Sequence, residues 1–86
     1  MDPDRTDAQI IAASLTEPEQ FGCIFDRHAP SLTRYLVSRV GSHDGEALLG
    51  EVFRVGFETR ARFDSEWTNA RPWLFGIASN LSLIHI

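Results

Sequence analysis

At 86 residues the chain has room for one domain with a modest core, and its hydrophobic content of 43% is too high for a disordered protein. The net charge of −4 argues against a protein that coats duplex DNA by charge alone. No apolar run reaches the roughly 18 residues that a transmembrane helix needs, so we expect no membrane association.

Charge is distributed unevenly along the chain. Residues 1–26 contain six acids and one arginine, whereas residues 27–86 contain seven arginines and six acids. The chain has no lysine, so its positive charge sits on planar guanidinium groups, which suit phosphates, carboxylates and aromatic faces. The acidic first part is interpreted either as solvated surface or as a screen for a basic face until a partner binds.

The first residues are polar and acidic and lack the pattern of a signal peptide. The lone Cys23 has no partner for an internal disulfide, which fits a reducing compartment. Both features predict a cytoplasmic protein. We expect residues 1–6 to form a disordered tail.

The spacing of apolar residues predicts an all-α fold, a compact bundle of about four helices. The expected helices span approximately residues 7–15, 17–40, 43–59 and 69–82, with a functional loop at 60–69. Predicted N-caps are Thr6 or Asp7 for the first helix, Thr16 for the second, and Thr68 or Asn69 for the fourth.

Two features of the long helices conflict with helix propensity. Pro30 falls inside the second helix, but the apolar register continues past it, so we expect a bend near residues 28–30 and a continuing helix. Gly45, Gly50 and Gly56 fall inside the third helix, at a cost of about 1 kcal/mol each relative to alanine. We expect Gly56 to permit close helix packing, and the pattern gives no reason for the other two.

The last residues, L-S-L-I-H-I at 81–86, are apolar and uncharged, which is unusual for a chain end. We expect a domain over residues 7–81, followed at 82–86 by an atypical tail that reflects truncation or a non-native junction.

No pattern of catalysis or metal binding is found in the sequence. The histidines and Cys23 lack the spacing of a zinc site, and no serine lies in a G-x-S-x-G turn. The carboxylates are spread along the helices rather than paired. We therefore expect no enzyme, no metal and no other cofactor, and interpret His28 as a core or boundary histidine bonded to the backbone.

Residues 60–80 have the composition of a single-strand recognition site. Arginines alternate there with Phe63, Trp67 and small polar residues, ahead of a helix with an apolar stripe. Arginine contacts phosphates, aromatic faces accept unstacked bases, and short polar side chains contact base edges. The alternative is a surface loop whose aromatic residues pack into the core, and this stretch alone leaves both interpretations open.

Four strings, in this order, resemble the second conserved domain of bacterial RNA polymerase sigma factors of the extracytoplasmic-function type. They are D-A-Q-I-I-A-A-S at 7–14, F-D-R-H-A-P-S-L-T-R-Y-L-V-S-R-V-G at 25–41, E-V-F-R-V-G-F at 51–57, and R-F-D-S-E-W-T-N-A-R-P-W-L-F-G-I-A-S-N at 62–80. The resemblance covers about residues 7–80.

The resemblance implies a helical bundle whose third helix docks on the clamp helices of the largest RNA polymerase subunit. The loop and fourth helix would recognise and melt the promoter minus-ten element and hold a flipped base of its non-template strand. An anti-sigma protein is a further implied partner. The implied polymerase-binding residues are Leu48, Glu51, Val52 and Arg54. The implied DNA-binding residues are Arg60, Arg62, Asp64, Trp67, Thr68, Asn69, Arg71 and Asn80.

The sequence also departs from that family. Ala47 and Gly50 stand where members usually carry an acid and often a glutamine, and Ser65, Trp67 and Thr68 replace the loop's usual proline, basic or polar residue, and glycine. The family's basic tail and its second DNA-binding domain, which reads the minus-thirty-five element, are not found in the sequence. The acidic balance of the chain, the missing basic tail and the missing second domain favour the alternative function of a helical interaction module that binds polymerase or an anti-sigma protein but no DNA.

Overall fold

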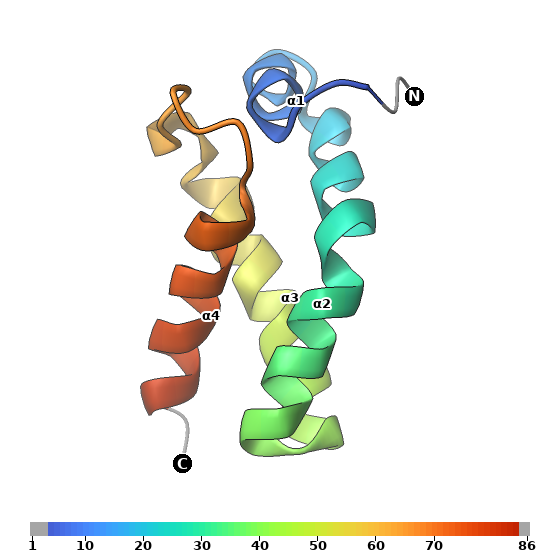
Figure 1. Ribbon diagram of the computed structural model, residues 1–86, viewed down its shortest axis with the longest axis vertical. Helices are drawn as coiled ribbons and strands as arrows, with labels where there is room; N and C mark the ends of the chain where they lie inside the picture. The colour runs from blue at the N-terminus through green and yellow to red at the C-terminus, as the bar shows by residue number, and fades with distance from the viewer. Residues whose placement is uncertain (1–3, 85–86) are drawn as a thin grey trace.

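Residues 4–84 are described by a computed structural model, and four α-helices account for most of them (Figure 1). The helices are α1 Asp7–Ser14, α2 Gly22–Val40, α3 Ser42–Glu58 and α4 Arg71–Ile84. Two short 3-10 helices, η1 Pro18–Phe21 and η2 Arg60–Arg62, precede α2 and follow α3. The predicted all-α bundle of about four helices is confirmed.

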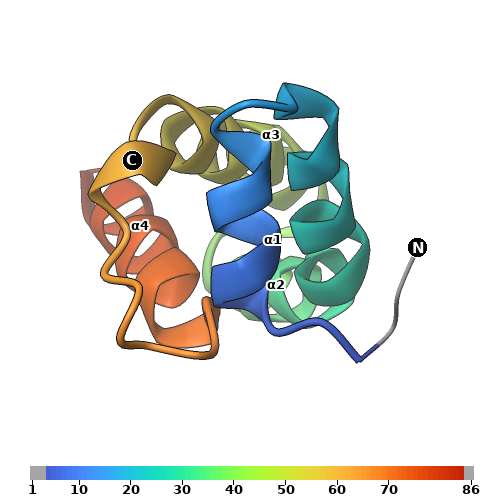
Figure 2. The ribbon, with the colours of Figure 1, turned by 90° about the horizontal axis from the view of Figure 1, so that it is seen from above.

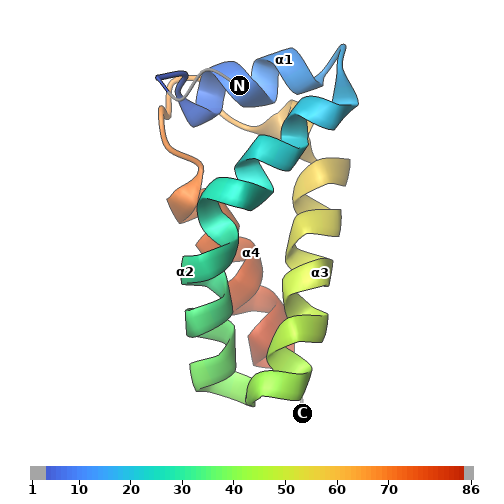
Figure 3. The same cartoon turned by 90° about the vertical axis from the view of Figure 1, so that its right-hand side faces the viewer.

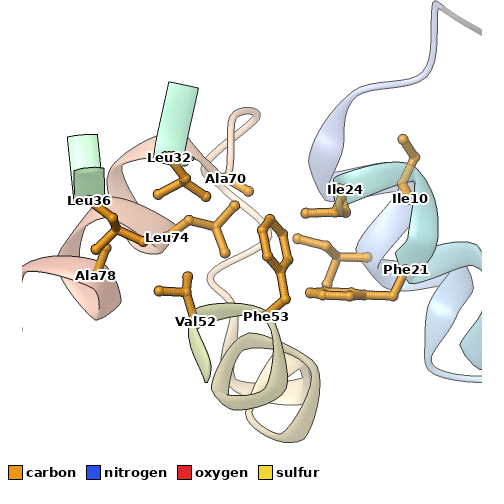
Figure 4. Close-up of a cluster of buried hydrophobic side chains, with 11 residues drawn as sticks. Ile10, Phe21, Ile24, Leu32, Leu36, Val52, Phe53, Ala70, Leu74 and Ala78 are labelled. Carbon is orange, nitrogen blue, oxygen red and sulfur yellow. The ribbon is translucent and has the colours of Figure 1, made fainter. Parts of the chain in front are cut away.

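Helices α2, α3 and α4 run along the long axis, and α1 lies across one end of the bundle (Figures 1 and 3). The molecule measures 36 × 22 × 20 Å. Its core lies where the three long helices meet, at Leu32, Leu36, Val52, Leu74 and Ala78. Beneath α1 the core continues through Ile10, Phe21, Ile24 and Phe53 (Figure 4).

Local sequence signals explain where α1 begins. The Thr6 hydroxyl accepts from the Gln9 backbone N–H at 3.1 Å, and the Gln9 side-chain oxygen accepts from the Thr6 N–H at 2.8 Å. This capping box satisfies two backbone donors, which is why the chain becomes helical here, and it confirms Thr6 as the cap. Of the expected disordered tail, residues 1–3 lie outside the described residues, while Thr6 is held by the box.

The expected single helix over 17–40 is two elements, η1 and α2. Thr16 does not cap it: the Thr16 hydroxyl donates to the Ala13 carbonyl, and Glu17 precedes η1 without a side-chain cap. The ring of Pro18 disfavours a helical conformation at Glu17, whose φ and ψ are −125° and 82°. Helix α2 does run without interruption through Pro30, and its axis changes direction along its length, as expected (Figure 3).

Gly41 and Gly45 set the approach of α2 to α3. Gly41 ends α2 with a φ of 90°, a conformation that favours glycine. A Cβ at Gly45 would lie 3.1 Å from the backbone nitrogen of Val37, whereas a Cβ at Gly56 would meet its neighbours at ordinary distances of 3.4 Å or more. The close helix approach expected at Gly56 therefore occurs at Gly45.

Helix α4 begins two residues later than expected and extends to Ile84. The Asn69 side-chain oxygen accepts from the Arg71 N–H at 2.7 Å, so Asn69 rather than Thr68 supplies the cap, and Pro72 lies in the first turn. Residues 82–84 of the expected tail are helical, with Ser82 buried, and residues 85–86 lie outside the described residues. None of the helices within residues 4–84 combines the length and apolar character needed to cross a bilayer.

Candidate nucleic-acid interface

The loop that follows α3 is anchored at its start by Arg60. Its Nε and Nη2 donate to the Ser14 carbonyl at 3.3 and 3.2 Å, and its Nη1 donates to the Phe57 carbonyl at 2.8 Å. The guanidinium also lies 4.0 Å from the centre of the Phe57 ring. Carbonyl groups at helix C-termini lack hydrogen-bond donors from their own helix. The Arg60 side chain donates hydrogen bonds to such carbonyls at the ends of both α1 and α3. Arg60, expected in the DNA-binding set, thus makes internal contacts with all three of its nitrogens.

The far end of the loop is anchored by Asp7 in the first turn of α1. One carboxylate oxygen accepts from the Ala70 backbone N–H at 2.7 Å and contacts His28 Nε2 at 2.7 Å. The other oxygen accepts from Arg27 Nη1 at 3.1 Å. A carboxylate only accepts, so His28 Nε2 carries the hydrogen of that contact. We call this cluster of Asp7, Arg27, His28 and the Ala70 N–H the Asp7 latch.

The latch corrects two sequence-based expectations. Asp7 is a buried anchor rather than a cap, and His28 bonds a carboxylate rather than the backbone. Burial alone would raise the pKa of the Asp7 carboxyl, but hydrogen bonds from the Ala70 N–H and from His28, the charge of His28, and the bond from Arg27 together hold that pKa below its usual value. The buried carboxylate therefore remains ionised and pins the start of α4 to α1 and α2. The backbone N–H of Ala8 adds a bond of 3.3 Å to the Thr68 carbonyl.

A tight turn shapes the loop between these anchors. The Asp64 side chain accepts from the Glu66 N–H at 3.0 Å, and the Asp64 carbonyl accepts from the Trp67 N–H at 3.0 Å. Asp64 thereby forms the turn that presents Trp67. Its carboxylate and that of Glu66 also bring negative charge to the loop, which opposes phosphate binding.

The two loop aromatics have different environments. Phe63 is half-buried and packs edge-on against Trp73, with ring centres 5.1 Å apart. Trp67 is 49% exposed. The two interpretations of this loop thus each describe one ring: Phe63 packs into the core, and Trp67 offers a face to solvent.

Polar side chains of the expected DNA-binding set do not form one cluster. Arg62 is exposed and has no polar side-chain partner within residues 4–84, and Thr68 is exposed on the loop. Arg71 is exposed at the start of α4, where its Nη1 donates to the Ser31 hydroxyl at 3.1 Å. Asn80 lies nine residues further along α4, which corresponds to about 13 Å and about half a turn around the axis. The structure therefore brings Arg62, Trp67, Thr68 and Arg71 to one end of the molecule and separates Asn80 from them.

A small pocket adjoins the loop but is not a ligand site of ordinary size. It has a volume of about 70 Å³ and lies between α1 and the loop, with Ile11, Leu15, Arg60, Phe63 and Ser65 in its lining. Pockets that enclose small molecules are usually about 300–1,000 Å³. Within residues 4–84, no group of three or more His, Cys, Asp or Glu side chains is placed to hold a metal ion.

The expected polymerase-binding residues lie on α3. Arg54 donates two hydrogen bonds to Glu51, at 3.1 and 2.8 Å, and two to Glu58, at 3.0 and 2.8 Å. The bonds from Arg54 lower the pKa of Glu51, and the two carboxylates raise the pKa of Arg54. Glu58, which the sequence did not single out, thus completes an exposed triad that we call the α3 triad.

The other two residues expected on this face are less accessible. Leu48 is half-buried, and Val52 is fully buried in the core. The structure therefore removes Val52 from any docking surface. It belongs to the apolar stripe of α3, which packs against α2 and α4.

Comparison of the chain with protein-family models, with curated proteins and with solved structures finds no match. The functional interpretation therefore rests on the residues and the geometry described above.

Proposed function

We propose that this chain is a non-catalytic domain that docks on RNA polymerase and recognises and melts the promoter minus-ten element, as its resemblance to sigma factors implies. The observation that supports this most is Trp67, which is half-exposed on a loop that is anchored at both ends and also carries the exposed Arg62. The cytoplasm, where polymerase works, would be its compartment, and the mechanism requires no cofactor.

The physical basis of melting is an exchange of stacking partners. Removing a base from a duplex costs a few kcal/mol, and stacking on an aromatic side chain returns about 1–3 kcal/mol per base. The face of Trp67 would accept the unstacked base, and Arg62 and Arg71 would hold adjoining phosphates. Because Arg60 and the Asp7 latch already order the loop, binding would cost less conformational entropy than it would for a mobile loop.

The α3 triad supports docking on a partner protein. Glu51 and Glu58 are exposed on both sides of Arg54, so the face can exchange internal ion pairs for pairs with basic residues of the polymerase clamp. Ala47 and Gly50, where the chain departs from the sigma family, are also exposed on α3. Two polar contacts would therefore be missing from this face, and we expect weaker docking than for a complete family member.

A strand-selection experiment tests this proposal. Strands that bind the chain are first enriched from a random single-stranded pool in the presence of polymerase core enzyme. The affinity of the chain for an enriched strand and for a scrambled version of it is then measured by fluorescence anisotropy. The chain should prefer the enriched strand, and Trp67→Ala should lose about 5- to 150-fold in affinity, the equivalent of about 1–3 kcal/mol. Leu83→Ala is the matched control, because Leu83 is 68% exposed at the far end of α4. Absence of any enriched strand, with polymerase bound and the domain folded, would sink the proposal.

The alternative function, a protein-interaction module without DNA binding, has its own support. The Arg60 guanidinium and the side-chain oxygen of Asn69 make internal hydrogen bonds, and Asp64 and Glu66 bring acids to the loop. Retention of polymerase or an anti-sigma protein in a pull-down, with no DNA binding at low salt, would favour this alternative. A negative pull-down would remove its main support.

A further inference from the structure

Charge in the bundle is segregated by helix. Helices α2 and α4 together contain four arginines and a single acid, Asp26, whereas α3 contains four acids and a single arginine. Both α2 and α4 pack on α3, and they also meet each other along a line away from it (Figure 2). Positive charge is therefore concentrated on the α2/α4 pair, and negative charge on α3.

An ordered row of side chains follows this α2/α4 contact. The Arg71 guanidinium lies 4.8 Å from the centre of the Phe75 ring, the Phe75 and Tyr35 rings are 5.1 Å apart, and the Arg39 guanidinium lies 5.4 Å from the Tyr35 ring. We call this row, together with Ser31 and Arg34, the α2/α4 seam. Stacking on the rings holds the two end arginines in place while leaving their charge exposed.

Arg34 adds a third cation to the seam. It lies three residues after Ser31, on the same face of α2, and Ser31 accepts a hydrogen bond from Arg71. Arg34 is exposed, and within residues 4–84 its side chain has no polar partner. Arg27 is not counted, because it is paired with Asp7, and Asp26 lies about 12 Å along α2 from Arg34.

We propose that the α2/α4 seam binds the phosphates of duplex DNA that adjoins the strand segment held by the loop. This inference rests on the proposed function, which it extends from a melted strand to the neighbouring double helix. Arg39 and Arg71 lie at the two ends of the row, and Arg34 lies about one turn along α2 from Ser31, so the seam offers three guanidinium groups to phosphates. Arg71 lies at the start of α4, directly after the loop, so the two surfaces are continuous.

The aromatic contacts favour a duplex over a single strand at this surface. The Tyr35 and Phe75 rings pack on each other, are half-buried, and are covered by Arg39 and Arg71. Both rings are less exposed than Trp67, the aromatic side chain that the loop offers to solvent. A surface of exposed arginines over half-buried rings suits phosphate contacts, which fix position without reading sequence.

The test compares salt dependence of binding for single-arginine variants of the 86-residue chain. Binding to a short duplex with a single-stranded extension is measured over a range of salt concentrations for the wild type, Arg34→Gln, Arg39→Gln and Arg5→Gln. Each seam variant should reduce the slope of log affinity against log salt by about 0.9, equally on the enriched and scrambled sequences. Arg5→Gln is the matched control, because it removes the same charge near α1, where Arg5 bonds Gln20.

Several results would overturn this inference. The first is that both seam variants show the same slope of log affinity against log salt as Arg5→Gln. The second is that the wild type binds no duplex at low salt. The third is that polyglutamate competes as effectively as DNA of equal charge. Arg34→Gln keeps the test valid if Arg39→Gln perturbs the fold, because Arg34 makes no internal polar contact with the described residues. If the chain shows no preference for the enriched strand but the seam variants still reduce the salt slope, the proposed function is contradicted. The assignment of the seam as a phosphate-binding surface then still holds.

Discussion

Asp7 is the residue on which the geometry of the candidate interface depends most. Its carboxylate joins α1 to α2 through Arg27 and His28, and to the start of α4 through the Ala70 N–H. Removal of one partner from such a buried cluster leaves the others unsatisfied, which costs more than the bond itself was worth. Asp7 should therefore matter both for stability and for the position of the loop.

Asp7→Asn should lower the free energy of unfolding by about 1–3 kcal/mol near neutral pH. Because the folded-state pKa of Asp7 lies below the ordinary value of about 3.9, its contribution is fully present above that pH and is lost as pH falls through the folded-state pKa. The difference between wild type and variant should therefore be constant above about pH 5 and shrink in acid. Urea unfolding at a series of pH values measures it.

Asp64→Asn is the control for this prediction, because Asp64 is an exposed acid whose turn an asparagine can also form. The difference in free energy of unfolding between Asp64→Asn and the wild type should change little with pH. A constant difference between wild type and Asp7→Asn down to pH 2 would contradict the assignment of an ionised, stabilising carboxylate.

At the scale of the element, the glycines of α3 have opposite roles. A Cβ at Gly50 would meet nothing within 4 Å, whereas one at Gly45 would press on the Val37 backbone at 3.1 Å. Gly50→Ala should raise the free energy of unfolding by about 1 kcal/mol through helix propensity alone. Gly45→Ala gains the same propensity, but the overpacking penalty of about 1–3 kcal/mol should make it destabilising. Thermal melting of the two variants checks both signs, and stabilisation by both would show that α2 and α3 can separate without cost.

At the scale of the whole molecule, the segregation of charge between helices implies two separate binding surfaces. The α3 triad lies on α3, whereas the α2/α4 seam is formed by side chains of the other two long helices. A partner protein bound at α3 would leave the loop and the seam exposed. In this arrangement polymerase and DNA could be bound together rather than in competition.

The sequence was sufficient to predict the features that interactions between neighbouring residues determine. Apolar periodicity placed four helices, and the Thr6 cap and the Pro30 bend followed from neighbouring residues. Contacts between distant residues could not be predicted in this way. The partner of Asp7 at Ala70 is 63 residues away, and that of Arg60 at Ser14 is 46 residues away.

The same limit explains the errors in the expected sites. Arg60 and Arg62 have the same chemistry in sequence, and only the position of the α1 C-terminus makes Arg60 an anchor. Val52 belongs to an apolar stripe whose buried side depends on where α2 and α4 pack. The partial burial of Phe63 likewise depends on its contact with Trp73, whereas Trp67 remains exposed.

If the two faces act independently, variants of each should affect one partner only. Glu51→Ala should weaken binding to polymerase core by about 1 kcal/mol, roughly fivefold, since Glu51 would supply most of the remaining polar specificity of this face. The melting temperature should change little, because the Glu51–Arg54 pair is exposed and Arg54 keeps Glu58. The salt dependence of DNA binding should not change, whereas Arg39→Gln should show the reverse pattern.

Glu19→Ala, which removes an exposed acid in η1, controls for net charge. Unchanged polymerase affinity in Glu51→Ala would show that the docking surface is not on α3, and unfolding of the variant would show that the triad is structural.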